Sequence, residues 1–232
     1  AGGGTDVIEF IEFSSSGGAT DFGDMSEQHN QPGNVSSTTR ACFGGGTLGG
    51  APYLNTKIDT VQIGTLGNAV DFGDLTAAVQ HPAGMCNLTR GVFAGGNPGV
   101  TIDFITIASA GNATDFGDCT AVCSQATGNS NAHGGIDEFF PRAPELYSPT
   151  GRPLSSGGGV GDVGLHLGGV DSPAAIDRIQ FSTISTAGNS VFFGNLTSAK
   201  YGGGSFGSST RALLGGTVGE SNEIDYVSFR SK

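Results

Sequence analysis

One phrase recurs along this chain, and its repetition limits the fold more than any other feature. The clearest copies are IDTVQIGTLGNAVDFGD at residues 58–74 and IDFITIASAGNATDFGD at residues 102–118. A looser copy begins at residue 8, a longer and more divergent copy at residue 176, and the first half of a fifth at residue 224. Repetition at this spacing predicts an architecture built by stacking one small unit several times.

Each copy predicts three or four short strands. Apolar and polar residues alternate over residues 58–63, a Gly-Asn or Gly-Gly dipeptide then favours a hairpin turn, and a second strand carries the Asp-Phe-Gly-Asp phrase. A further strand is predicted where Thr-Arg precedes apolar residues and glycines, at residues 38–46, 88–96 and 209–216. Units of this size are typical of propeller blades. We therefore expect a single all-β repeat domain over residues 1–232, a propeller-like array of about four blades. One strand is surplus, because residues 224–229 duplicate residues 8–13.

Composition excludes some partners. The chain has a net charge of -11 although only 13% of its residues are charged. A protein of this kind has no basic patch for phosphates, which argues against nucleic acid and against anionic lipid surfaces. No apolar run approaches the roughly 20 residues that span a bilayer. The chain begins with Ala-Gly-Gly-Gly and not with Met, so we expect a processed polypeptide or a part of a longer one.

The cysteines and histidines do not form a metal motif in the sequence. Cys119 and Cys123 fall on an expected strand, about 13 Å apart if extended, which is too far for a direct disulfide bond. No second pair of ligands follows at metal spacing, and the four histidines (His29, His81, His133 and His166) do not recur at equivalent positions. We expect packed or bridged cysteines, no metal, no cofactor and no catalytic residues.

The aspartates of the repeated phrase are predicted to be structural, because an active site is normally singular whereas these recur. The prediction is that the Arg of one repeat pairs with an Asp of the next. The expected pairs are Arg40 with Asp71, Arg90 with Asp115, and, if four blades close into a ring, Arg211 with Asp21.

The fourth copy of the phrase supports this pairing. Gly164 stands where the third repeat should have its Arg, and Phe192 and Asn195 replace the aspartates of the fourth. Both partners of that junction are lost together, as expected for a buried ion pair. A closed four-bladed ring, a partial ring in a longer chain and completion by a neighbouring subunit all stay open.

A long insertion interrupts the third repeat at about residues 129–158. It contains Phe139, Phe140, Arg142 and Tyr147, which are predicted to bind a protein or sugar partner. Long loops on rigid scaffolds often carry function, but a tolerated surface excursion fits the sequence equally well.

Glycine pairs that end strands resemble kelch repeats. The phrases IDFITI, GNATDFGD and LTRGVFAGG resemble kelch-like repeat proteins of marine bacteriophages. The resemblance implies a β-propeller and a non-enzymatic virion or extracellular protein, such as a tail-fibre or capsid-associated binding module. Its expected partners are other virion proteins within an oligomeric assembly and a host-surface glycan or protein. A bacterial adhesin or filament component is the alternative. The third possible function is an enzyme on the same fold, such as a copper oxidase, which would need a cluster of Tyr, Cys and His ligands.

Overall fold

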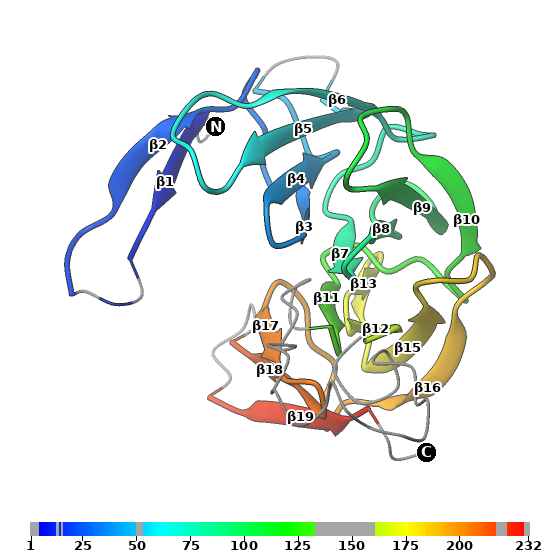
Figure 1. Ribbon diagram of the computed structural model, residues 1–232. Helices are drawn as coiled ribbons and strands as arrows, with labels where there is room; N and C mark the ends of the chain where they lie inside the picture. The colour runs from blue at the N-terminus through cyan, green and yellow to red at the C-terminus, as the bar shows by residue number, and fades with distance from the viewer. Residues whose placement is uncertain are drawn as a thin grey trace, which may run out of the picture.

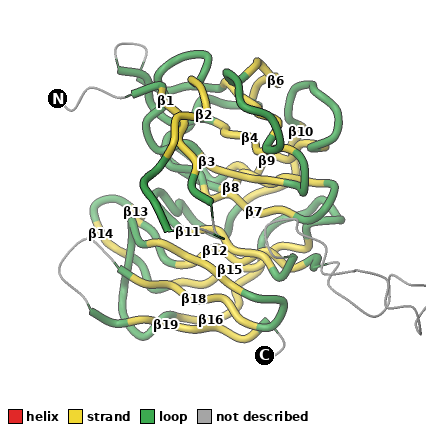
Figure 2. Tube along the Cα trace, turned by 60° about the vertical axis from the view of Figure 1, so that its left-hand side comes forward, coloured by secondary structure: helices red, strands yellow, loops and turns green. Residues whose placement is uncertain are grey.

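The protein is all-β. The computed structural model describes residues 5–12, 14, 16–49, 53–132, 161–216 and 222–229. Every regular element among these residues is a β-strand, and none is a helix (Figure 2). Accordingly, this part of the chain contains no helix of the length and hydropathy needed to cross a membrane.

Three blades are complete four-stranded antiparallel sheets, with strands in chain order from the centre outward. Blade 1 contains β3 (Gly33–Ser36), β4 (Arg40–Gly44), β5 (Lys57–Gln62) and β6 (Val70–Asp74). Blade 2 contains β7 (Ala83–Cys86), β8 (Arg90–Ala94), β9 (Thr101–Thr106) and β10 (Thr114–Asp118). Blade 3 contains β11 (Thr127–Ser130), β12 (Val163–Leu167), β15 (Arg178–Thr183) and β16 (Val191–Asn195). A two-residue ribbon of β13 (Val170–Asp171) and β14 (Ala174–Ala175) joins β12 to β15.

Two further pieces of blade lie at the ends of the chain. Blade 4 has three described strands, β17 (Gly204–Gly207), β18 (Arg211–Gly215) and β19 (Ile224–Ser228). A hairpin of β1 (Val7–Phe10) and β2 (Thr20–Asp24) lies beside blade 1, apart from blade 4 (Figure 1). The four sheets form a ring, which confirms the predicted four-bladed propeller, and β1 and β19 occupy the same place in the repeat.

Strand register aligns the repeats and corrects one boundary. Ile8, Ile58 and Ile102 each lie opposite the glycine of the Asp-Phe-Gly-Asp phrase, followed by a bulge. In blade 3 the residue at that place is Ile179, opposite Gly194. The fourth copy therefore begins at Ile179 and is not longer than the others. Residue 176 belongs to the preceding connection.

The apolar core is divided among the blade junctions. Phe72, Leu75 and Phe93 belong to the cluster between blades 1 and 2. Separate clusters join blade 2 to blade 3, blade 3 to blade 4, and the hairpin to blade 1. Because successive blades share no strand, burial of apolar surface at these junctions holds the ring together.

The glycine of the repeated phrase allows two backbones to meet at three of the junctions, at Gly23, Gly73 and Gly117. Gly73 has a φ of +148°, and a Cβ placed there would overlap the backbone of Gly111 in the next blade. Gly111 donates its N–H to the carbonyl of Phe72 at 2.7 Å. The side chain of Asn112 accepts a hydrogen bond from the N–H of Asp74 at 3.1 Å. The Gly-Asn turns therefore dock onto the preceding blade, in addition to closing their own hairpins.

We predict that Gly73→Ala lowers the free energy of unfolding by about 1–3 kcal/mol, because alanine would be strained at this φ and would push the blades apart. Gly64→Ala is the matched control, since a Cβ at Gly64 has no neighbour within 4 Å. Denaturant unfolding of both variants tests this, and equal effects at the two positions would contradict it.

Candidate functional site

The predicted recognition residues lie outside the described residues. Phe139, Phe140, Arg142 and Tyr147 all belong to residues 133–160. Their role therefore stays a prediction from sequence.

The predicted arginines do reach the next blade, but not the predicted partners. Arg40 donates to the carbonyl oxygens of Ile107 and Ala108 at 3.1 and 2.9 Å. Arg90 likewise donates to the carbonyl of Ser185 at 2.7 Å and lies over the Phe104 ring. The predicted partners are on the second and fourth strands of the same blade, with the third strand between them, and the aspartates bond to their own strands. Asp71 accepts from the N–H of Gly73 and Asp115 from that of Gly117, each at 3.1 Å.

The ring-closing pair is not formed either. Arg211 lies over the ring of Tyr226 at 5.4 Å, and Asp21 lies opposite Glu9 in the hairpin. No ion pair between these two described side chains is present. At the third repeat, register places Val163, and not Gly164, in the position of the Arg. The alignment of the repeats that places Gly164 at the Arg position is therefore wrong by one residue.

A different polar contact joins each unit to the next along the chain, from the hairpin to blade 1 and then from blade 1 to blade 4. The acceptor is a buried side chain on the third strand of one blade, and the donor is a Ser or Thr two residues after the Asp-Phe-Gly-Asp strand of the preceding blade. Asp103 accepts the N–H and the hydroxyl of Thr76 at 2.9 and 2.7 Å. The same contact joins Asp59 to Ser26, Gln180 to Thr120, and Asp225 to Thr197. For Asp59, Asp103 and Asp225 the signal is visible in the sequence as the acidic residue after the isoleucine that opens the phrase, whereas the fourth copy has Gln180 after Ile179.

We predict that Asp103→Ala destabilises the protein by about 1–3 kcal/mol, because it leaves two donors of Thr76 without an acceptor. Asp103→Asn keeps an acceptor oxygen, as Gln180 does at the next junction, and should retain most of the stability. Burial raises the pKa of Asp103, against the hydrogen bonds from Thr76. The folded state then binds more protons than the unfolded state between the normal and the raised pKa, so ionisation of Asp103 lowers stability as pH rises through that interval.

Unfolding of wild type and the two variants between pH 3 and pH 7 tests this contact. The pH-dependent part that is due to Asp103 should disappear in Asp103→Asn. An alanine variant as stable as wild type would contradict the role of the contact.

Two acceptors also have a buried basic side chain close by. Lys200 lies 2.8 Å from Asp225 and 3.3 Å from Glu223, and its side chain is 1% exposed. At the equivalent place before blade 1, His29 Nε2 lies 3.8 Å from Asp59. These pairs belong to the junctions and not to an open site.

We predict that Lys200→Met costs about 3–5 kcal/mol of stability, because Asp225 would keep a buried charge without its cation. Lys57→Met is the control. Its pair with Glu27 is 3.6 Å long and partly exposed, so its loss should cost less than about 1 kcal/mol. Similar costs for the two variants would show that the Lys200 pair is not the stronger contact.

The inner strands of all four blades surround a central cavity of about 500 Å³. Its polar lining consists of small neutral side chains, such as Asn34, Asn129 and Ser205. Cys42 and Cys86 also line it, and burial raises the pKa of both thiols. Among the described residues the cavity therefore offers hydrogen-bonding groups and neutral thiols.

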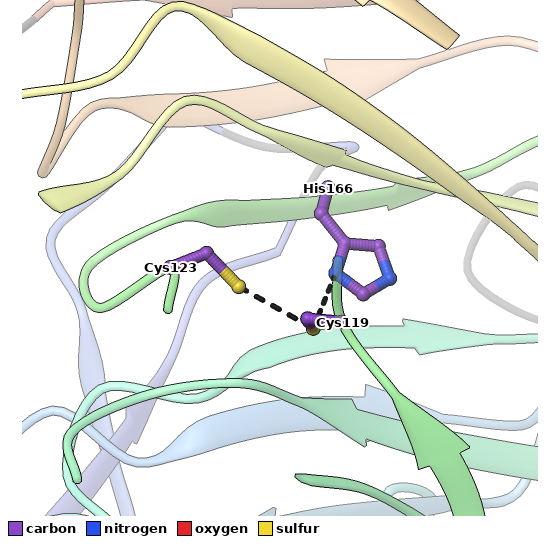
Figure 3. Close-up of side chains that lie close together, drawn as sticks. All are labelled: Cys119, Cys123 and His166. Atoms are coloured by element: carbon purple, nitrogen blue, oxygen red, sulfur yellow. Dashed lines mark hydrogen bonds between the residues drawn. The ribbon is translucent and has the colours of Figure 1, made fainter. Parts of the chain in front are cut away.

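One cluster of potential metal ligands lies between blades 2 and 3 (Figure 3). Cys119 and Cys123 are in the connection after β10 and not on a strand, and their Sγ atoms are 3.4 Å apart. Nδ1 of His166, on β12, lies 3.7 Å from Sγ of Cys119. The hydrogen bond between the thiols raises the pKa of Cys119 and lowers that of Cys123. This grouping was not predicted, because the two cysteines were expected to be extended and His166 matches no other histidine in the repeats.

Comparison with known proteins adds no family. No protein family matches this chain, and no curated protein sequence matches it.

Proposed function

We propose that the protein is a non-enzymatic structural and recognition component of an extracellular assembly, and specifically of a phage virion. The virion assignment is supported by the resemblance of its repeat phrases to kelch-like phage proteins. The partners would be other virion proteins and a glycan or protein on the host surface.

The structural role is supported by the contacts that the recurring polar positions of the repeat make. At all four described junctions, the buried acceptor on the third strand bonds to the preceding unit. Asp59, Asp103 and Asp225 are thus occupied in joining blades, and Gln180 takes the same place without a charge. Carboxyl groups held in this way suit a rigid scaffold, whereas a catalytic carboxyl group must reach its substrate.

Two strand edges support a role in an assembly. Among the described strands, β1 pairs only with β2, and β19 only with β18. The side chains of Val7, Ile224 and Tyr226 are 48%, 65% and 68% exposed. An apolar strand edge of this kind is a surface on which further strands add, either from another chain or from more of the same polypeptide.

Recognition is assigned by sequence to the insertion. A loop on a rigid propeller can change its contacts without changing the blades. Aromatic side chains beside an Arg suit a protein or sugar surface, and Phe139, Phe140, Arg142 and Tyr147 are the residues proposed to make that contact.

Co-sedimentation with particles from the source of the protein tests the proposal. Particles would be separated on a density gradient, and the copy number of this chain would be measured against a capsid protein by quantitative mass spectrometry. We expect a fixed copy number in fractions with DNA-filled capsids. Recovery with filaments or cell envelopes would favour the adhesin and reject the virion, and recovery only as free protein would reject both.

A further inference from the structure

Three equivalent positions at each junction hold different side chains. Two of them are the first and fifth residues after the fourth strand of one blade, and the third is on the second strand of the next blade. Between blades 1 and 2 all three are apolar. The residues at the four junctions are Met25, His29 and Phe43; Leu75, Val79 and Phe93; Cys119, Cys123 and His166; and Leu196, Lys200 and Leu214. The junction between blades 2 and 3 thus replaces a plain apolar contact with three metal-binding side chains.

The spacing of the three ligand atoms suits one small ion. They all lie within 4.8 Å of one another. Bond lengths of about 2.3 Å for Zn–S and about 2.0–2.1 Å for Zn–N give edges of about 3.8 Å and about 3.6 Å in a tetrahedral site. The observed distances are 3.4 Å between the two Sγ atoms and 3.7 Å from Cys119 Sγ to His166 Nδ1. Shifts of a few tenths of an ångström in these two distances would therefore bring them to ligand spacing.

The surroundings favour a bound ion with a charge of two. Cys119, Cys123 and His166 are 6%, 0% and 1% exposed, and the two cysteines belong to an apolar cluster that includes Met85 and Phe116. Two thiolates and a neutral imidazole around Zn²⁺ have no net charge, whereas a singly charged ion would leave a buried negative charge, which is costly. Oγ of Ser182 lies 3.5 Å from Nε2 of His166. A proton on Nε2 directed at Ser182 would leave Nδ1 free to bind the metal.

The place of the cluster in the chain gives the ion a structural purpose. In blades 1, 2 and 4 three residues connect the first strand to the second, whereas in blade 3 the insertion separates β11 from β12. Closing a longer loop costs more conformational entropy. A metal bound by β12 and by the connection after β10 would offset this cost by fastening β12 directly to blade 2.

We propose that Cys119, Cys123 and His166 bind one thiophilic cation, which fastens blade 3 to blade 2. The charge balance of two thiolates and a neutral imidazole selects Zn²⁺ as this cation. This site is independent of the proposed function, because it would stabilise the propeller whether or not the protein belongs to a virion.

The test is metal analysis of the full chain, purified under reducing conditions without a histidine tag and reconstituted with Zn²⁺ alone. We expect about one zinc per chain and a Tm that falls when a chelator removes it. Replacement by Co²⁺ should give the thiolate charge-transfer bands of a cobalt–sulfur site. The matched variant Cys119→Leu/Cys123→Val/His166→Phe copies the junction between blades 1 and 2. It should fold, by circular dichroism, bind no zinc, and show a Tm that does not respond to chelator.

The control Cys86→Ala should bind zinc as the wild type does, because Cys86 is buried but lies outside the cluster. Zinc retained by the triple variant would overturn the site. Four reactive thiols in the unfolded wild-type chain with no bound metal would also overturn it, in favour of packed cysteines. In a second sample prepared without reductant, two thiols missing before reduction would overturn it in favour of a disulfide bond. Copper bound in preference to zinc, and lost in the triple variant, would support the site and overturn the choice of metal.

Discussion

The propeller depends on one hydrogen-bonded contact that is repeated between neighbouring units. A side-chain oxygen on the third strand of a blade accepts from the Ser or Thr that follows the fourth strand of the unit before it. At Asp103 both distances to Thr76 are below 3.0 Å, and the acceptor is only 5% exposed. Blades in this protein share no strands, so each contact of this kind fixes the position of one sheet against the next. At three of the junctions the glycine of the repeated phrase also lets the two backbones approach.

The same junction tolerates very different neighbours around that contact. Val79 adds apolar surface, Lys200 adds a cation, and His29 adds an imidazole at the equivalent place. Each substitution changes which interactions surround the acceptor while the strand register stays the same. A regular backbone with one fixed polar contact therefore allows individual junctions to acquire their own chemistry, and the cluster of Cys119, Cys123 and His166 is the most divergent of them.

The sequence predicts the strands and blades well because their signals are local. Alternation, Gly-Asn turns and the repeated phrase each lie within one unit. Contacts between units are not local, and there the sequence was less informative. Charge favours a pair of Arg40 with Asp71, but β5 lies between their strands. Asp71 accepts a hydrogen bond from Gly73, and backbone carbonyls of the next blade receive the Arg instead. The approach of Cys119 to Cys123 depends on the curvature of a connection that alternation does not describe.

The arrangement of the hydrophobic clusters has a consequence for cooperativity. Each cluster joins only adjacent units, so the free energy of the fold is close to a sum of single-unit and nearest-neighbour contributions, as in a one-dimensional chain. Opening an interior blade breaks two interfaces, whereas opening the hairpin β1–β2 breaks only the one with blade 1. Fluctuations should therefore concentrate at the hairpin, and interior blades should exchange their amide protons last.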